Sequence, residues 1–521
     1  MKPAILLYNP PSTFNEEKWR RPLPLNLLSI CSLLKQEEFD ISITQELPNK
    51  AYKKFRTSLD NAICLGISCM TGIQIFNGLK LAEMIRTAKP DLPIIWGGYH
   101  PTACPEQTLQ NEYVDIVVRG YGEITFSEFV ERLVNKQSYE DIEGISFKKD
   151  GRVVNTPSRP IPNLNDLPSL PYHLFDVEQF FRKSGTKTLH YISSRGCPHR
   201  CGFCADYVIY KRKWNALSAE RVLSDFERLK KIYNYDSIRF YDSNLFVNEK
   251  RTKRICEGVI EKGLNFKWLT CNGDAFGLAR YHSDTLRLMN KAGVTNVLLG
   301  VESGYPPALE CIQKTATVED NLKTVRRLHE HNISIGFSFM FGFPYDLPEK
   351  DMEKEHKTEL IATMKTIAEF SDDYLEGDYY LLFLFTPYPG VQLFPRYKEL
   401  GYIPPDSFEG WSKVNLNEAD SCPWVTKRLL KLYRHCLRSN WFFMHKLETV
   451  IFRRSKRLLL RRCASYCCER TRGILKEKIN RGKLSLPFIF RIIRFYFLGK
   501  GFMLKLMRKY FIKPLSNREN K

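Results

Sequence analysis

The sequence predicts an α/β protein in which a doubly wound amino-terminal domain precedes a partial (β/α)6 barrel and a helical, basic carboxyl-terminal region. Short apolar runs alternate with amphipathic stretches over the first 150 residues, and the same alternation resumes after residue 186. Strands that alternate with helices form parallel sheets, because each helix carries the chain back to the start of the next strand. We divide the chain into residues 1–150, a linker at 151–185, a barrel at 186–400 and a helical region at 401–521.

In the first domain the apolar runs predict five strands, with helices between them. A doubly wound, Rossmann-like sheet binds ligands beyond the carboxyl ends of its strands. Three of those ends are rich in small residues, which let a ligand approach the backbone closely. Ser68, Thr71, Gly97 and Gly98 are therefore candidate ligand contacts, although no GxGxxG follows the first strand to indicate a dinucleotide. The expected strands are 4–8, 39–43, 62–68, 93–96 and 114–118, and the expected helices are 25–35, 73–87 and 126–134.

The linker and the barrel follow from proline density and from the returning strand pattern. Five prolines between residues 157 and 171 predict an extended linker, because proline stops helices and central strands. Six further strands with helices between them predict a partial, TIM-like barrel, whose chemistry lies at the carboxyl ends of its strands. These strands are expected at 189–193, 237–241, 266–270, 296–301, 334–339 and 379–385.

The net charge of +21 is concentrated in the tail, since residues 425–521 carry 27 Lys and Arg against 4 Asp and Glu. A basic tail indicates an anionic surface nearby. Residues 484–513 mix basic and aromatic side chains, which fits a helix on an anionic membrane; a helical cap on the barrel is the alternative, and nucleic acid is the least favoured partner. No apolar run is long enough to span a bilayer.

The cysteines indicate a metal site. There are 15 of them, an odd number, and no secretory signal is seen at the start, so we expect a reduced, cytoplasmic setting, with the tail at the membrane periphery. Cys197, Cys201 and Cys204 follow the first barrel strand within eight residues, and three thiolates can hold an iron–sulfur cluster while leaving one iron open for chemistry. The alternatives are structural cysteines or a zinc site with His199, although zinc sites usually show a second cysteine pair, which is absent.

This motif resembles the CxxxCxxC signature of the radical S-adenosylmethionine superfamily. The resemblance implies a [4Fe-4S] cluster whose open iron binds S-adenosylmethionine, and reductive cleavage of that cosubstrate to a 5′-deoxyadenosyl radical. No catalytic residue beyond the cluster is assigned. Further positions resemble the cosubstrate-binding elements of the family, namely Phe203 before the last cysteine, Asp242 and Asn244 in an FxDDxF-like element, Glu302 and Ser303 in a GxESG element, and Gly342 in a GxPGET-like turn.

Two departures from the family pattern concern the cosubstrate. Tyr345 and Asp346 stand where the family usually has Gly-Glu, and Gly273 stands where it often has an arginine. One usual contact to S-adenosylmethionine is therefore missing or is supplied from elsewhere in the chain.

The first domain resembles the cobalamin (B12)-binding domain of one branch of this superfamily. Residues 96–103 are similar to its GGxHPT element and residues 119–123 to its xGEGE element. The resemblance implies bound cobalamin, with a degenerate domain that holds no cofactor as the alternative. The DxHxxG motif that supplies an axial histidine is absent, and we expect His100 to be a loop histidine and not a cobalt ligand.

Together these resemblances imply a cobalamin-dependent radical enzyme that methylates an unactivated carbon of a small or lipid-like substrate. It would need an electron donor such as a flavodoxin or ferredoxin. One alternative is a cyclase or rearrangement enzyme of the same branch, without methyl transfer. Another, from a different class, is an RNA- or cofactor-binding protein with an inactive cluster site.

Overall fold

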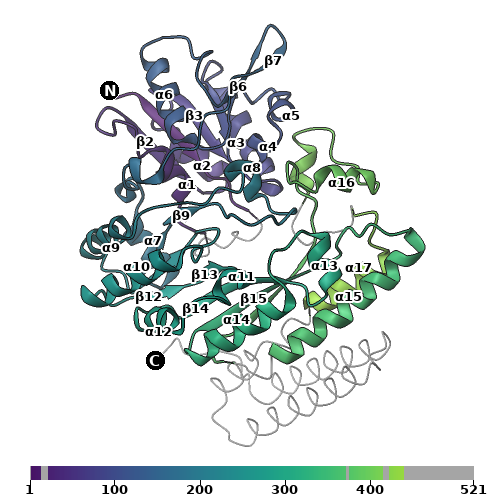
Figure 1. Cartoon of the computed structure of the whole chain (residues 1–521). Helices are drawn as coiled ribbons and strands as arrows, with labels where there is room; N and C mark the ends of the chain where they lie inside the picture. The colour runs from purple at the N-terminus through teal and green to yellow at the C-terminus, as the bar shows by residue number, and fades with distance from the viewer. Residues whose placement is uncertain (1, 13–20, 371–374, 415–421, 439–521) are drawn as a thin grey trace, which may run out of the picture.

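Two α/β units make up the protein, with the amino-terminal domain above the barrel in the view of Figure 1. The computed structural model describes residues 2–12, 21–370, 375–414 and 422–438. Both units are built on parallel strands with helices packed against them, as the alternating sequence pattern predicts.

The first sheet has seven strands in the order β2-β1-β3-β4-β5-β6-β7, and β1 to β5 are parallel. The order reverses at β1, because β2 lies on one side of it and β3 on the other; ligands bind at such a switch point. Every residue of β1 is buried, which explains its continuous apolar sequence. The parallel strands are β1 (Ala4–Tyr8), β2 (Asp40–Thr44), β3 (Ala62–Ser68), β4 (Ile94–Gly97) and β5 (Ile116–Val118).

Helices of the first domain begin and end at different residues from those predicted. Helix α1 (Leu25–Ile30) ends early, whereas α6 (Gly122–Val134) begins four residues before the expected start, with Glu123 in its first turn, where a carboxylate suits the helix dipole. The other helices are α2 (Pro48–Phe55), α3 (Ile73–Ala88), α4 (Tyr99–Ala103) and α5 (Pro105–Leu109).

The boundary at residue 150 is wrong by a few residues. An antiparallel hairpin of β6 (Ile145–Lys149) and β7 (Arg152–Asn155) extends the sheet to Asn155, just before the prolines begin. The linker is also not extended throughout. After its last proline, Asp176 caps α7 (Val177–Ser184), and two 3-10 turns precede that helix.

The barrel strands follow one another in sequence order, all parallel, in two sheets ordered β8-β11-β12 and β13-β14-β15-β16. The expected third strand, 266–270, coincides with β12, and a further short strand that was not predicted, β13, follows Thr270, which has a positive φ of 51°. Each of the six expected strands overlaps a strand of these two sheets, and β13 is additional. The strands are β8 (Thr188–Tyr191), β11 (Ser237–Phe240), β12 (Lys267–Leu269), β13 (Cys271–Gly273), β14 (Asn296–Glu302), β15 (Ser334–Phe341) and β16 (Tyr379–Leu384).

Helices and two short strands connect the barrel strands. The short strands β9 (Ser194–Arg195) and β10 (Asn215–Ala216) form an antiparallel pair after β8. The helices are α8 (Asp206–Tyr210), α9 (Ala219–Tyr233), α10 (Glu249–Glu261), α11 (Ala275–Leu278), α12 (Ser283–Lys291), α13 (Pro306–Cys311), α14 (Val318–Glu330) and α15 (Glu349–Phe370).

The chain after the barrel returns to the first domain. After α16 (Phe394–Glu399), Phe408 packs edge-on against the ring of Trp96 at 5.1 Å, and the indole of Trp411 donates to Gln107 at 2.7 Å. The region from residue 401 is therefore not helical throughout, because this stretch is shaped by aromatic contacts. Helix α17 (Lys427–Arg438) follows, and the predicted basic amphipathic segment at 484–513 lies outside the described residues. Among the helices that are described, none is long and apolar enough to cross a membrane.

Two glycines of the barrel, each just after a helix, allow a matched test of how closely a helix end packs against the start of β12. Gly293 and Gly263 both have positive φ, at 96° and 60°. A Cβ at Gly293 would lie 2.4 Å from the carbonyl oxygen of Phe266, whereas one at Gly263 would meet nothing within 4 Å. We expect Gly263→Ala to cost about 1 kcal/mol of stability through backbone strain alone. Gly293→Ala must also displace β12, and should lower the apparent Tm in calorimetry at least twice as much. Equal shifts for the two variants would contradict this packing.

Candidate active site

A cavity of about 700 Å³ lies between the two domains, at the carboxyl ends of the first sheet. One wall contains all four ligand contacts predicted in the first domain, Ser68, Thr71, Gly97 and Gly98. The facing wall comes from the barrel and includes Arg195 of β9, Tyr210 of α8 and Tyr388 after β16. The structure thus brings the strand ends of one domain against the start of the other domain's cysteine loop.

The backbone of the first domain forms a shallow cradle in this cavity. Gly98 has a φ of 96°, and a Cβ there would lie 2.6 Å from the carbonyl oxygen of Cys69, so only glycine lets β4 end so close to β3. Beside it the hydroxyl of Ser68 accepts a hydrogen bond from Asn26 at 2.9 Å. Glycine backbone and short side chains at two neighbouring strand ends fit a large flat ligand such as cobalamin.

His100 does not take part in the cavity wall. It is 1% exposed, pairs through Nδ1 with the Thr71 hydroxyl at 2.8 Å and stacks on Phe408. Burial lowers its pKa to about 3, so the ring is neutral at physiological pH. Among the described residues that line the cavity there is no histidine. His100 lies in α4 and not in a loop as expected, and its lack of a bond to cobalt stays a prediction.

The cysteine loop is held in place at its two glycines. Gly196 has a φ of 75°, and a Cβ there would lie 2.2 Å from the carbonyl oxygen of Lys213. A Cβ at Gly202 would lie 2.6 Å from Leu393 Cγ, and the backbone of Gly202 donates its N–H to the carbonyl of Ile312 at 2.9 Å and accepts from the N–H of Leu393 at 3.0 Å. These contacts explain why the motif carries glycine at both positions, and they fix Cys197, Cys201 and Cys204 between α8, α13 and the turn before α16.

Within the described part of the chain, no group of three His, Cys, Asp or Glu side chains is arranged to hold a single metal ion. His199, the fourth ligand in the zinc alternative, pairs with Asp274 at 3.0 Å. Burial raises the pKa of all three thiols, that of Cys197 to about 11. Thiolate ligands must lose their protons, so metal binding here is coupled to proton release.

Asp242, predicted to contact the cosubstrate, lies behind the loop instead. Its carboxylate is fully buried and accepts from the N–H and hydroxyl of Ser193, at 3.0 and 2.7 Å, and from the hydroxyl of Ser194 at 2.5 Å. Burial raises its pKa, and these hydrogen bonds oppose that rise. A side chain so enclosed cannot reach a ligand in the open site, and its effect is to fix the chain just before Cys197.

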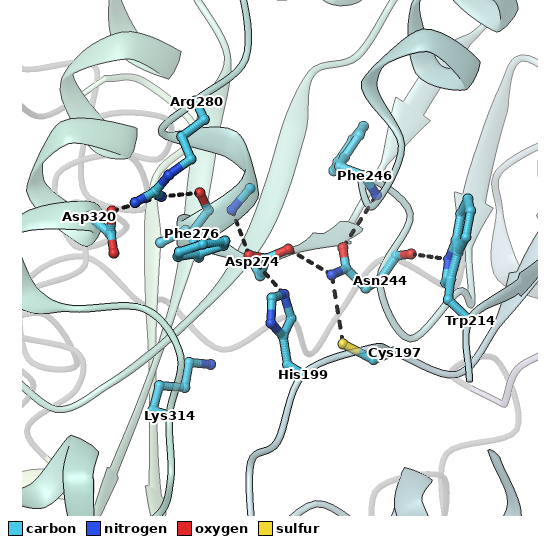
Figure 2. Close-up of polar contacts among 12 residues, drawn as sticks. Cys197, His199, Trp214, Asn244, Phe246, Asp274, Phe276, Arg280, Lys314 and Asp320 are labelled. Atoms are coloured by element: carbon cyan, nitrogen blue, oxygen red, sulfur yellow. Dashed lines mark hydrogen bonds and ion pairs between the residues drawn. The ribbon is translucent and has the colours of Figure 1, made fainter. Parts of the chain in front are cut away.

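Asn244 comes from the same strand end but faces the loop (Figure 2). Its side-chain amide donates to Asp274 Oδ2 at 2.7 Å and to Cys197 Sγ at 3.7 Å. Burial would raise the pKa of Asp274, but its hydrogen bond and charge interaction with His199, and the N–H donors around it, hold that pKa below the usual value. The predicted residue Asn244 therefore lies beside a predicted cluster ligand.

Glu302 ends β14 in a strained conformation. Its φ is 64°, and the β14–β15 register shifts between Gly300 and Glu302. Left-handed backbone at a non-glycine residue marks sites where function maintains strain. Its carboxylate lies 3.4 Å from the ammonium of Lys314, which is itself buried and also interacts electrostatically with Cys201 and Asp274.

Lys314 was not identified from the sequence, because no motif separates it from the other lysines. A Cβ at Gly273 would lie 2.8 Å from Leu278 Cδ1 and 3.0 Å from Phe246 Cδ2, so a larger residue where the family often has an arginine would require these side chains to shift. Lys314, in the turn after α13, places a positive charge beside Glu302 instead.

Three other predicted contacts lie away from the open site or at its edge. Ser303 is fully buried and its hydroxyl pairs with Thr363 of α15 at 2.9 Å. The carbonyl of Gly342 accepts from the indole of Trp424 at 3.0 Å, beneath α17, so this turn supports the barrel. Neither is placed to touch a cosubstrate. Phe203 is half-buried against the barrel core, and its contact with adenine stays a prediction.

A buried ion pair joins the two domains in the cavity wall. Arg195 Nη1 lies 2.6 Å from Glu123 Oε1, and the hydroxyl of Ser29 donates to the same oxygen at 2.6 Å. Arg195 precedes Cys197 by two residues, and Glu123 lies in the first turn of α6. Burial would raise the pKa of Glu123, but Arg195 and Ser29 hold it below its usual value, so the carboxylate is ionised.

Comparison with protein-family models identifies both domains. Residues 191–354 match the radical SAM superfamily and residues 22–130 match the B12 binding domain. The chain therefore belongs to the radical S-adenosylmethionine superfamily, and within it to the enzymes that carry a cobalamin-binding domain. Its cofactors are a [4Fe-4S] cluster, S-adenosylmethionine and cobalamin.

Relatives and a solved structure extend this comparison. An uncharacterized methyltransferase of Pyrococcus horikoshii is 28% identical over 380 residues, which cover 71% of this chain and 77% of the relative. An anaerobic magnesium-protoporphyrin IX monomethyl ester cyclase of Synechocystis is 25% identical, covering 60% of each chain, and a hopanoid C-3 methylase of Methylococcus capsulatus is 24% identical, covering 62% of each. The fold resembles the cobalamin-dependent radical enzyme OxsB with a TM-score of 0.68 at 18% identity, over 91% of this chain and 71% of that one.

Breaking the ion pair between the domains should destabilise the protein strongly. Glu123→Gln leaves Arg195 buried without its counter-charge, which typically costs about 3 kcal/mol or more. Ser29→Ala, the control, keeps both charges and removes only the hydroxyl that donates to Glu123 and accepts from Arg195, at about 1 kcal/mol for each hydrogen bond. Thermal unfolding and limited proteolysis of the linker should show the larger effect for Glu123→Gln. A native-like Tm in that variant would be evidence against the importance of the pair.

The same ion pair gives a pH dependence. The pKa of Glu123 is lower in the folded protein than in the unfolded chain, so its stabilisation is fully present above the unfolded pKa. It is lost as the pH falls through the lowered folded value. Relative to Glu123→Gln, the native protein should therefore lose its stability advantage in acid, which unfolding curves recorded between pH 7 and pH 3 would measure.

Proposed function

We propose that this protein is a cobalamin-dependent radical C-methyltransferase acting on an unactivated carbon of a neutral, apolar substrate. The observation that carries the proposal is the cavity between the domains, which contains the cobalamin-domain strand ends in one wall and the start of the cysteine loop in the other. A methylating enzyme of this kind needs both groups close to one substrate carbon. Relatives that are named as a methyltransferase and a methylase support the same reaction.

The cluster and its cosubstrate supply a 5′-deoxyadenosyl radical that removes a substrate hydrogen, and cobalamin supplies the methyl group. The chain's residues hold and shield these groups. Cys197, Cys201 and Cys204 would bind three irons of the cluster. Glu302 and Lys314, of opposite charge, match the ammonium and carboxylate of the methionine part of S-adenosylmethionine. The reductant would be a one-electron donor such as a flavodoxin or ferredoxin.

The charge of the cavity indicates the substrate class. Glu123 and Arg195 are the only charged side chains among the described lining residues, and they neutralise each other. A substrate with a phosphate or carboxylate would find no unpaired cation in that part of the wall. The barrel side is aliphatic and aromatic, and the hopanoid methylase among the relatives supports a lipid-like substrate. Further barrel-side residues of the wall are Ile192, Ala205, Val208, Ile209, Tyr241 and Pro389.

A second candidate is a radical cyclase or rearrangement enzyme of the same family, which the magnesium-protoporphyrin relative favours. The products separate the two reactions. Methyl transfer consumes two molecules of S-adenosylmethionine and leaves S-adenosylhomocysteine beside 5′-deoxyadenosine, whereas a cyclase leaves 5′-deoxyadenosine alone. Both products in equal amounts, in anaerobic assays of the reconstituted protein with an apolar substrate, are the expected result. The absence of S-adenosylhomocysteine would favour the cyclase.

Replacing any one of Cys197, Cys201 and Cys204 by alanine should remove the bound cluster. A cluster held by two thiolates loses a strong ligand, so iron content and the visible absorbance should fall to near background, and 5′-deoxyadenosine should not form. Cys104→Ala, which removes a half-buried thiol of the first domain, is the control and should retain the cluster. Zinc in the purified protein, or turnover in a motif variant, would overturn the assignment.

Lys314→Met tests the cosubstrate site. The variant keeps the length of the side chain but removes the charge, and a charge-assisted hydrogen bond is worth about 1.5–3 kcal/mol, so affinity for S-adenosylmethionine should fall about tenfold or more. Lys323→Met, on the exposed face of α14, is the control. Equilibrium binding to the cluster-loaded protein measures both. Unchanged affinity in Lys314→Met would place the carboxylate elsewhere.

A further inference from the structure

The side-chain amide of Asn244 bridges the cysteine loop and Asp274 (Figure 2). Asn244 is 2% exposed, and every polar atom of its side chain has a partner. Its Nδ2 donates to Asp274 Oδ2 and to Cys197 Sγ, and its Oδ1 accepts from the N–H of Phe246 at 3.3 Å. The two N–H groups of the amide therefore have two acceptors, one carboxylate and one cysteine sulfur.

Only one orientation of this amide is chemically possible. The Asp274 carboxylate can only accept hydrogen bonds, and the N–H of Phe246 can only donate. Rotating the amide by 180° would place Oδ1 against a carboxylate and the NH2 group against a donor. The NH2 group consequently faces Asp274, and its second N–H is directed at Cys197.

The residues around this amide leave it little freedom. Asp274 caps α11 by accepting from the N–H of Gly277 at 2.7 Å, and it pairs with His199 at 3.0 Å. The backbone carbonyl of Asn244 accepts from the indole of Trp214 at 3.1 Å. The carboxylate and the backbone thus hold the amide from two sides, so that the donor to the sulfur is already in place before a cluster binds.

Cys197 differs from the other two cysteines because its sulfur accepts a hydrogen bond from a side chain. Backbone N–H groups lie near all three sulfurs. Among the described residues, however, Asn244 is the one side chain that donates to any of them. A side-chain donor can be changed by substitution, whereas backbone donors cannot.

We propose that Asn244, positioned by Asp274, tunes the reduction potential of the cluster by donating a hydrogen bond to the Cys197 thiolate. Reduction adds one electron and makes the cluster and its thiolates more negative, so a donated hydrogen bond stabilises the reduced state more than the oxidised state. The bond therefore makes the cluster easier to reduce. This inference rests on the proposed function, because it requires Cys197 to be a cluster ligand.

The test is a potentiometric titration of the reconstituted protein, followed by electron paramagnetic resonance of the reduced cluster. Asn244→Leu keeps the volume and removes the donor. Asn272→Leu is the matched control, because the Asn272 amide donates at 2.7 Å to the carbonyl of Asp242 and not to a cysteine. The ratio of reduced to oxidised cluster at a fixed potential should fall about tenfold in Asn244→Leu, a shift of about 59 mV to more negative potential. Asn272→Leu should titrate as the native protein does.

A second variant and a second measurement keep the inference testable if Asn244→Leu does not fold. Asn244→Asp keeps an acceptor for Phe246 but puts two carboxylates side by side, where they share one proton and leave none for the sulfur. It should shift the potential in the same direction. In electron–nuclear double resonance, the native protein and Asn272→Leu should show one exchangeable-proton coupling that is missing from both Asn244 variants, while the couplings from the backbone N–H groups near the three sulfurs remain in all of them.

The outcomes separate this inference from the proposed function. Iron content and cleavage of S-adenosylmethionine are measured on the same samples. Native potential in both Asn244 variants, or the full native set of exchangeable-proton couplings in both, in a protein that cleaves S-adenosylmethionine, overturns the inference alone. An equal shift in Asn272→Leu also overturns it, since the effect would then be general to the strand end. A native protein that binds no cluster overturns the proposed function, and this inference with it.

Discussion

The buried ion pair of Arg195 and Glu123 is the interaction on which the arrangement of the two domains depends. Arg195 lies two residues before the first cysteine of the loop, and Glu123 lies at the start of the helix that follows β5. A bond of 2.6 Å between them sets the position of the loop relative to the cobalamin-domain strand ends. Because both charges are buried, neither can leave the other without a large desolvation penalty. The same pair also leaves the described cavity wall without net charge.

Two residues just after the second barrel strand, β11, make hydrogen bonds that position the cysteine loop. Asp242 holds the residues just before the loop from behind, through Ser193 and Ser194, whereas Asn244 reaches the sulfur of Cys197 from the side. The family resemblance places both residues at the cosubstrate; in the structure Asp242 makes its hydrogen bonds to the residues before the loop, and Asn244 makes its own to a loop sulfur and to Asp274.

Charge is distributed unequally between the two parts of the site. Glu302, Lys314 and Asp274 lie around the cysteine loop on the barrel side, where the proposed zwitterionic cosubstrate would need partners of both signs. The cavity between the domains has one neutralised pair and otherwise uncharged lining among the described residues. This division suits a reaction in which a charged cosubstrate is cleaved beside a neutral carbon skeleton.

Local sequence patterns were sufficient for the parallel strands of the first domain, for a strand at each of the six positions expected in the barrel, and for the cysteine motif. Each of these depends on neighbours in the chain: apolar periodicity, or spacing within a short loop. The roles of Glu302 and of the four small residues of the first domain stay predictions, although the structure places the four in one cavity wall and gives Glu302 a left-handed backbone.

Contacts between distant segments decided the rest. Lys314 is brought to the site by its ion pair with Glu302, whereas Ser303 pairs with Thr363 of α15 and Gly342 accepts from the indole of Trp424. The roles of Asp242 and Asn244 differ although they stand two residues apart, because one side chain meets two serines and the other meets a sulfur and a carboxylate. Periodicity and motif spacing report which face of a strand a residue occupies, but the partner on that face comes from a remote part of the chain, and only the folded structure brings the two together.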